Sequence, residues 1–273
     1  MTKAVSLIGP DRKYERWRWQ IFAITWLAYT GFYLTRKSFA VAKIEMAHPA
    51  GLGLTNNNLA SIDFVYLVTY AIGQFAWGIC GDRWGTRRVI VAGMLCSVLA
   101  AVAMGASSTV ILLGTFFGLQ GFCQSTGWAP LSKNIGNFFS QRERGTVMGL
   151  WCTNYAVGGF VASIIAGRFG QALGWRWAFF GPAAILFAIW ILFLLFQRNR
   201  PEDVGLPSVE SYHGEPEPVL ARDASVPEEK EGSWSVVLDV LKKPMVLLLA
   251  GVYFFMKPTR YAIMNWAPKY IHE

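Results

Sequence analysis

The feature that most constrains this chain is a series of apolar segments, each about as long as a bilayer is thick. A helix of about 20 apolar residues spans the hydrocarbon core of a membrane. Such segments lie at 19–43, 58–79, 88–106, 109–131, 145–167, 176–196 and 244–267. A composition of 53% hydrophobic and 15% charged residues excludes an ordinary soluble domain. The sequence therefore predicts an all-α membrane protein.

The cations of the chain sort by loop. If the N-terminus is cytoplasmic, 17 of the 25 Lys and Arg lie on the inside, four on the outside and four within the helices. Cytoplasmic loops carry an excess of Lys and Arg. We therefore expect a multi-pass protein of the plasma (inner) membrane with a cytoplasmic N-terminus. The net charge of +8 comes mainly from the basic residues of these cytoplasmic loops. We therefore expect the lipid bilayer as a partner and no nucleic acid.

The apolar pattern divides the chain into four parts. Residues 1–18 form a cytoplasmic N-terminal segment, and 19–196 form a six-helix transmembrane bundle. Residues 197–243 hold ten of the 17 acidic residues and little apolar periodicity, which predicts a cytoplasmic linker between two bundles. Residues 244–273 provide the first helix of an incomplete C-terminal bundle.

The sequence shows no constellation for catalysis. His48, His213 and His272 lie in loops or at the end of the chain, and the four cysteines lack metal-ligand or redox spacing. No nucleophile–base pair or glycine-rich phosphate loop is present. We expect no enzyme activity, no cofactor and no metal site.

The loop between the second and third helices carries a complete motif. Residues 78–88 read GICGDRWGTRR, which fits G-x-x-x-D-R-x-G-x-R-R. This loop resembles the signature of the major facilitator superfamily. The resemblance predicts a cytoplasmic conformational latch, in which Asp82 accepts hydrogen bonds from a helix end or an Arg. Its residues are Gly78, Asp82, Arg83, Gly85, Arg87 and Arg88.

Six further motifs narrow the resemblance. They read YLTRKSFA (33–40), QSTGWAP (124–130), FFSQRERG (138–145), WCTNYAVGG (151–159), RNRPEDVGLP (198–207) and TRYAIMNWAP (259–268). In this order they resemble the organophosphate:phosphate antiporter family, which carries glycerol-3-phosphate, hexose phosphates and phosphoglycerate. The resemblance implies a major facilitator fold of twelve helices, with a substrate site between two six-helix bundles. This chain would contain the N-terminal bundle and only the first helix of the C-terminal bundle, so we expect it to be truncated. The remaining C-terminal helices of the full-length protein would then be its packing partners.

The resemblance also implies the ligands of the phosphoryl group. Each of the first helices of the two bundles offers one arginine, and these positions match Arg36 and Arg260. A guanidinium stays charged at any relevant pH and binds phosphate oxygens with two parallel hydrogen bonds. The expected function is therefore exchange of inorganic phosphate for a phosphorylated small metabolite by alternating access. An ion pair of Arg36 with Asp63 is the structural alternative.

Three tyrosines match the pocket tyrosines of the family, namely Tyr29, Tyr33 and Tyr70. Packing between helices is the alternative for each. Lys37 points about 100° away from Arg36 around the helix. We expect it to pair with Asp63 or backbone carbonyls, or to extend outward toward the membrane surface, with ligand contact as the alternative.

Three positions depart from the family pattern. Gln74 replaces a lysine four residues after Tyr70, and Tyr155 replaces a histidine of the fifth helix. The seventh helix carries an unusual Lys257, which we expect to supply the charge missing at Gln74. The alternative is that Lys257 pairs with carbonyls freed by Pro258.

Two rival functions stay open. Transporter-like membrane receptors that sense external sugar phosphate have similar motifs, and the sequence does not separate them from carriers. A proton-coupled solute carrier is disfavoured, because Asp63 is the single acidic residue within the predicted spans and proton coupling usually needs a titrating group there.

Overall fold

The protein is described by a computed structural model that covers residues 11–213, 239 and 241–272. All elements of this described part are helical. They are α1 (Arg12–Ala47), α2 (Asn56–Trp84), α3 (Thr86–Ala106), α4 (Val110–Gln124), α5 (Trp128–Phe138), α6 (Gln141–Trp151), α7 (Thr153–Leu173), α8 (Trp177–Phe196), the 3-10 turn η1 (Pro201–Val204), α9 (Val209–His213) and α12 (Pro244–His272). This architecture confirms the predicted all-α class.

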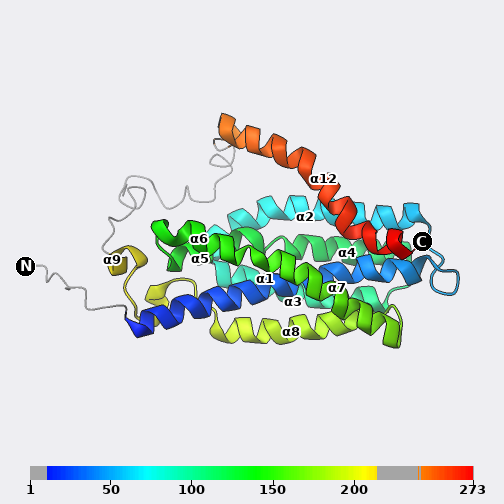
Figure 1. The fold of residues 1–273 in the computed structure, drawn as a ribbon, viewed down its shortest axis with the longest axis horizontal. Helices are drawn as coiled ribbons and strands as arrows, with labels where there is room; N and C mark the ends of the chain where they lie inside the picture. The colour runs from blue at the N-terminus through cyan, green and yellow to red at the C-terminus, as the bar shows by residue number, and fades with distance from the viewer. Residues whose placement is uncertain (1–10, 214–238, 240, 273) are drawn as a thin grey trace, which may run out of the picture.

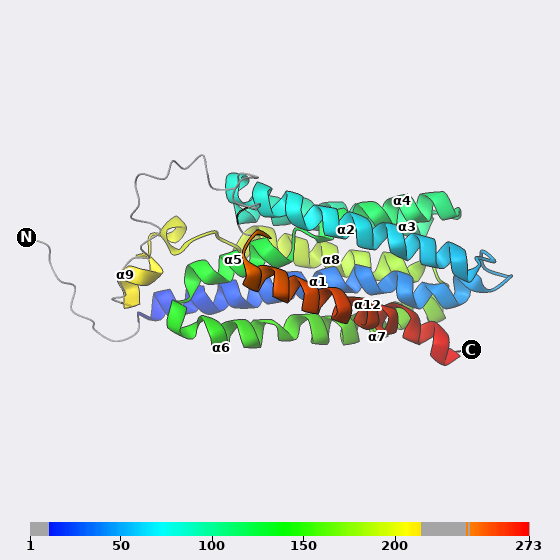
Figure 2. The ribbon, with the colours of Figure 1, turned by 90° about the horizontal axis from the view of Figure 1, so that it is seen from above.

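The long helices run side by side along the long axis of the molecule (Figure 1). Helix α1 lies at the centre, where it packs against α7, α8 and α12, while α2 packs on α4 and α3 packs on α4 and α8. Figure 2 shows α12 crossing the outside of this bundle in front of α1. Helix α1 thus makes the most extensive contact with α12, the first helix of the predicted second bundle.

Short polar residues define where the helices begin and turn. The side chains of Asp11, Thr55 and Thr109 accept backbone hydrogen bonds at the starts of α1, α2 and α4. Gly85 separates α2 from α3 with a φ of +81°, a left-handed conformation that L side chains rarely adopt. The capping side chains and Gly85 therefore mark where one helix ends and the next begins.

Five stretches of described helix are long and apolar enough to cross a membrane, judged by length and composition. They are Asn56–Gly78, Thr86–Ala106, Gln141–Leu173, Trp177–Phe196 and Pro244–Ala267. Helix α1 is not among them, because its Tyr, Trp, Arg and Lys residues lower its mean hydropathy. Helix α4 is too short, with 15 residues. The pattern agrees with a multi-pass membrane protein and singles out α1 as its polar helix.

The predicted uninterrupted helix over 109–131 is wrong, because the chain breaks between α4 and α5. The hydroxyl of Ser125 donates to the Phe122 carbonyl at 2.6 Å, and that of Thr126 donates to the Cys123 carbonyl at 2.8 Å. Such side-chain bonds compete with the helical ladder, and Pro130 lacks the N–H that would continue it. A milder break at Cys152 separates α6 from α7 within the predicted fifth helix.

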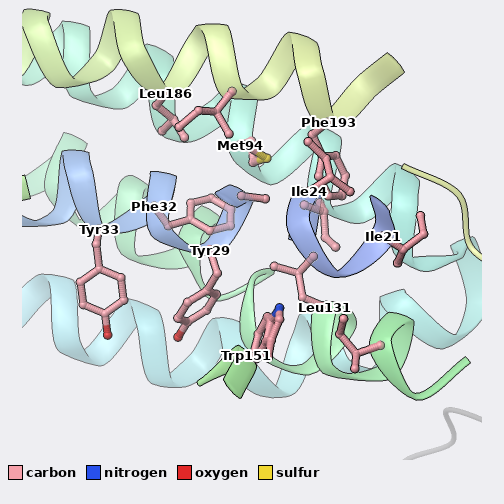
Figure 3. Close-up of a cluster of buried hydrophobic side chains, with 14 of the residues drawn as sticks. Ile21, Ile24, Tyr29, Phe32, Tyr33, Met94, Leu131, Trp151, Leu186 and Phe193 are labelled. Atoms are coloured by element: carbon pink, nitrogen blue, oxygen red, sulfur yellow. The ribbon is translucent and has the colours of Figure 1, made fainter. Parts of the chain in front are cut away.

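The main hydrophobic core surrounds the first half of α1. Ile21, Phe32, Trp151, Leu186 and Phe193 are all buried in it. Figure 3 shows Phe32 and Ile24 on the side of α1 that faces Leu186 and Phe193 of α8. This packing fixes the rotation of α1 and therefore the direction in which its polar side chains point.

The segment after α8, which was predicted as a linker between two bundles, begins with the two short helices η1 and α9. Tyr212 of α9 stacks on Tyr14 of α1, with ring centroids 3.8 Å apart and an interplanar angle of 9°. The Tyr212 hydroxyl also accepts a hydrogen bond from the Asp11 amide at 3.0 Å. Burial raises the pKa of Tyr14, so its ring stacks as the neutral phenol. Residues 214–238 and 240 of this segment lie outside the described part.

Candidate functional site

Arg36 is the centre of the candidate site. Its side chain lies in the middle of α1 and is buried, with 9% of its surface exposed. The guanidinium carbon is 4.6 Å from the ring centre of Tyr33 and 4.9 Å from that of Tyr70 on α2. A cation over an aromatic face is attracted by the ring quadrupole, by about 2 kcal/mol when desolvated. Aromatic rings of α1 and α2 thus both lie against this guanidinium.

A glutamine that was not predicted as a site residue completes the environment of Arg36. The Nε of Arg36 donates to Oε1 of Gln124 at 3.0 Å, and the Tyr66 hydroxyl donates to the same oxygen at 3.0 Å. Nε2 of Gln124 donates to the Thr35 hydroxyl at 3.0 Å. A glutamine inside an apolar span was the signal available in the sequence, since a buried amide needs partners.

One donor of Arg36 remains free. Its Nη2 is buried and has no hydrogen-bond partner among the described residues. Buried polar groups are almost always paired, and an unpaired one costs about 1–3 kcal/mol or more when charged. A buried charged donor without a protein partner is the arrangement that an anionic ligand would complete.

Tyr29 and Tyr33 lie on one face of α1, as predicted. Their ring centroids are 5.8 Å apart, and both side chains are buried. Figure 3 shows both hydroxyl groups pointing to the same side, away from Leu186 of α8. Gly158 allows α7 to lie close beside them, because a Cβ there would come within 3.3 Å of Tyr33. The structure therefore brings Tyr29, Tyr33 and Tyr70 into one group with Arg36.

The remaining predicted ligands lie on other helices. Arg260 of α12 is exposed, and its guanidinium carbon lies 4.7 Å from the centre of the Tyr155 ring on α7. Lys257 lies 5.3 Å and 5.9 Å from the rings of Tyr253 and Tyr261 on its own helix. Gln74 is half-buried on α2, one turn after Tyr70.

The alternative in which Asp63 neutralises Arg36 is wrong. The carboxylate of Asp63 on α2 instead forms an ion pair with Lys43, whose side chain is fully buried. Lys43 ends the predicted span 19–43 and was counted among the four outside cations, but α1 continues to Ala47 and the Lys43 side chain is buried in the bundle. Asp63 therefore does not act as a counter-ion of Arg36, whose charge can be balanced by an anionic ligand.

Lysines also join α12 to the first bundle. Nζ of Lys37 donates to the Met264 carbonyl, which agrees with the predicted pairing to backbone rather than ligand. Lys43 donates to the Asn265 carbonyl at 3.3 Å, and Lys269 donates to the Asn56 side chain. These contacts all involve the last third of α12 and form a seam, which we call the lysine seam.

The predicted latch loop is attached to the end of α8. The Arg87 amide donates to the Asn199 side chain at 2.9 Å, and its Nη2 donates to the Leu194 carbonyl at 2.5 Å. Arg83 and Arg88 are exposed, and a Cβ at Gly78 would meet nothing within 4 Å. The side chain of Asp82 lies outside the described residues, so its proposed role stays a prediction.

Within the described residues, no group of three or more His, Cys, Asp or Glu side chains could hold a metal ion.

Several proteins resemble this chain. It is 30% identical to a probable hexose phosphate transport protein of Chlamydia trachomatis over 269 residues, which cover 96% of this chain and 59% of that protein. It is 28% identical to the glycerol-3-phosphate transporter of Bacillus subtilis and 28% identical to the membrane sensor protein UhpC of Escherichia coli, with the same coverage. These names confirm the resemblance drawn from the six motifs. The chain spans 59% of the length of each of these relatives.

The fold is shared with a solved structure. A bacterial homologue of the human lysosomal transporter Spinster, in an inward-facing and unoccupied conformation, superposes with a TM-score of 0.64 at 16% identity. The match covers 96% of this chain and 56% of that one. Residues 23–273 match the description Major Facilitator Superfamily. The chain therefore belongs to the major facilitator superfamily.

Proposed function

We propose that the protein is a secondary transporter, not an enzyme, that exchanges inorganic phosphate for a phosphorylated small metabolite by alternating access. The observation that carries this proposal is the free Nη2 donor of Arg36, buried between Tyr33 and Tyr70. A cation inside a membrane bundle costs at least about 3 kcal/mol and usually marks a substrate path. The similarity to hexose phosphate and glycerol-3-phosphate transporters supports the same ligand class.

The charge of the site suits a phosphate monoester. Such a group carries about −1.5 to −2 charges at neutral pH. Arg36 and Arg260 together supply two positive charges, from the first helix of each bundle. We propose that both bind the phosphoryl group, with hydroxyl groups of Tyr29, Tyr33 and Tyr70 donating to its oxygens.

The organic part of the substrate would contact the positions that depart from the family. We propose that Lys257 on α12 supplies the cation missing at Gln74 on α2. A third cation favours a substrate with an additional acidic group, such as a phosphorylated carboxylate.

The orientation of the chain decides which side the site opens to. We propose that the N-terminus is cytoplasmic, on the basis of the 17 to 4 distribution of loop cations. The lysine seam then lies toward the outer end of the bundle, while α12 stands away from the bundle at its other end (Figure 1). This arrangement would close the site to the outside and open it to the cytoplasm.

A sensor of external sugar phosphate is the second candidate, favoured by the similarity to the sensor protein UhpC. It would bind the same ligand without moving it. Transport and binding therefore need separate measurements.

The proposal is tested by two experiments on the purified full-length protein, in which the helices of both bundles are present. Isothermal titration calorimetry in lipid nanodiscs measures binding of inorganic phosphate, and counterflow of labelled phosphate in vesicles measures exchange against a panel of organic phosphates. Binding together with counterflow supports the transporter. Binding without counterflow favours the sensor, and the absence of binding contradicts both.

A further inference from the structure

The amide of Gln124 fixes the orientation of Arg36. We infer that Gln124 is a positioning residue, which makes Arg36 meet a phosphoryl group with its terminal Nη edge rather than with the edge that contains Nε. The inference rests on the proposed function and adds the direction from which the anion is bound. It concerns a contact between α1 and α4 that the sequence motifs did not indicate.

A guanidinium offers two edges that can each bind an anion with two parallel hydrogen bonds. One edge consists of Nε–H and one Nη–H, and the other of the two terminal Nη groups. In this protein Nε is already committed to Oε1 of Gln124 at 3.0 Å. Nη2 is buried without a partner among the described residues. The edge that contains Nε is therefore occupied, and Nη2 is a donor of the terminal edge that a ligand can use.

The glutamine can act as a fixed acceptor because its own amide is held. It is fully buried, and its Nε2 donates to the Thr35 hydroxyl at 3.0 Å. Its Oε1 accepts from both Arg36 and Tyr66, which uses the two lone pairs of that oxygen. Turning the amide over would place an NH₂ group against a cation. The orientation with Oε1 toward Arg36 is therefore the stable one.

A neutral acceptor also leaves the charge of Arg36 intact. On the same helix, Lys43 is paired with the carboxylate of Asp63, which neutralises it. A carboxylate at position 124 would do the same to Arg36 and would compete with phosphate. The structure thus contains one buried cation that is neutralised and another that is only oriented.

The experiment measures the affinity of inorganic phosphate in nanodiscs by isothermal titration calorimetry. Gln124→Met keeps the length of the side chain and removes the acceptor. We expect affinity to fall about tenfold, since a hydrogen bond to a charged group is lost and Arg36 becomes free to turn. Gln124→Glu should bind still more weakly, because it introduces a competing negative charge. The matched control is Gln120→Met, one turn earlier on α4, where the glutamine is equally buried but has no partner among the described residues.

A double-mutant cycle separates positioning from general stability. Thr35→Val removes the group that holds the Gln124 amide, so it should weaken binding by less than Gln124→Met. The double variant Gln124→Met/Thr35→Val should bind as Gln124→Met does, because Thr35 acts through Gln124. Thermal unfolding midpoints of all variants show whether the fold is retained.

Three outcomes would overturn the inference. Unchanged affinity in Gln124→Met, an equal loss in Gln120→Met, or additive losses in the double variant would each contradict a positioning role while leaving the phosphate site in place. Failure of the unaltered protein to bind phosphate would overturn the proposed function together with this inference.

Discussion

The guanidinium of Arg260 lies 4.7 Å over the ring of Tyr155, so α12 and α7 meet through a cation on an aromatic face. The two residues come from the predicted second and first bundles. This contact holds the second arginine of the candidate site at the edge of the first bundle, on a helix that otherwise presents most of its apolar side chains to its surroundings.

Tyr155 should contribute through its ring and not through its hydroxyl. We expect Tyr155→Phe to keep phosphate affinity near that of the unaltered protein and Tyr155→Leu to lower it about two- to thirtyfold, since a cation–π contact contributes about 0.5–2 kcal/mol. Calorimetric titration with phosphate measures both. Phe160→Leu, at an exposed ring on the same helix, is the matched control. Equal losses in the Phe and Leu variants would instead indicate a role for the hydroxyl.

Arg36→Lys and Arg260→Lys should each nearly abolish phosphate exchange. Lysine keeps the charge but lacks the planar pair of donors that binds two phosphate oxygens at once. The loss should be larger at Arg36, which is buried between two tyrosines, than at the exposed Arg260. Counterflow of labelled phosphate in vesicles provides the measurement, with Arg168→Lys on the exposed side of α7 as control. Near-normal phosphate affinity in either variant would remove that arginine from the site.

The proposed compensation between Lys257 and Gln74 calls for a paired substitution. Lys257→Gln should weaken binding of an acidic organic phosphate more than binding of inorganic phosphate, because its ammonium is expected to contact the organic part. Adding Gln74→Lys should restore much of the loss. Competition of unlabelled organic phosphates against labelled phosphate gives the ratio of the two affinities, for the organic phosphate and for inorganic phosphate. Lys242→Gln at an exposed position is the control. If the affinity for every tested organic phosphate stays the same in Lys257→Gln, this lysine is structural.

The buried pair of Lys43 and Asp63 should be more sensitive to losing one partner than to losing both. Asp63→Asn leaves the fully buried ammonium of Lys43 without its counter-ion, which costs about 3–5 kcal/mol. The double variant Lys43→Met/Asp63→Leu replaces both charges with apolar groups and should recover most of that stability. Apparent melting temperatures in detergent, followed by circular dichroism, compare the variants. A double variant as unstable as Asp63→Asn would show that the pair is needed for more than mutual neutralisation.

The sequence predicts the helices well, because their positions follow from local composition. The breaks are different. At Ser125 and Thr126 the helix ends because the side-chain hydroxyls donate hydrogen bonds to backbone carbonyls. Hydropathy averaged over a window of residues carries no information about such bonds. Segment boundaries within an apolar run therefore need the structure.

The candidate site shows the same division. Arg36, Tyr33 and Tyr70 could be named in advance, because a motif and helical spacing indicate them. Gln124 begins the quoted motif QSTGWAP, but its role could not be named, since that role depends on α1, α2 and α4 meeting at one point. The partner of Asp63 was missed because three cations of α1 are candidates and only the packed helices select Lys43.

The packing around Tyr29 has an optical consequence. Its ring lies 5.5 Å from those of both Trp128 and Trp151, and the two indoles are 5.7 Å apart. Indoles this close couple their electronic transitions, and this coupling changes when their relative orientation changes. Since Tyr29 also contacts Tyr33, which lies against Arg36, the near-ultraviolet dichroism of the two indoles gives the protein an intrinsic spectroscopic reporter close to the candidate site.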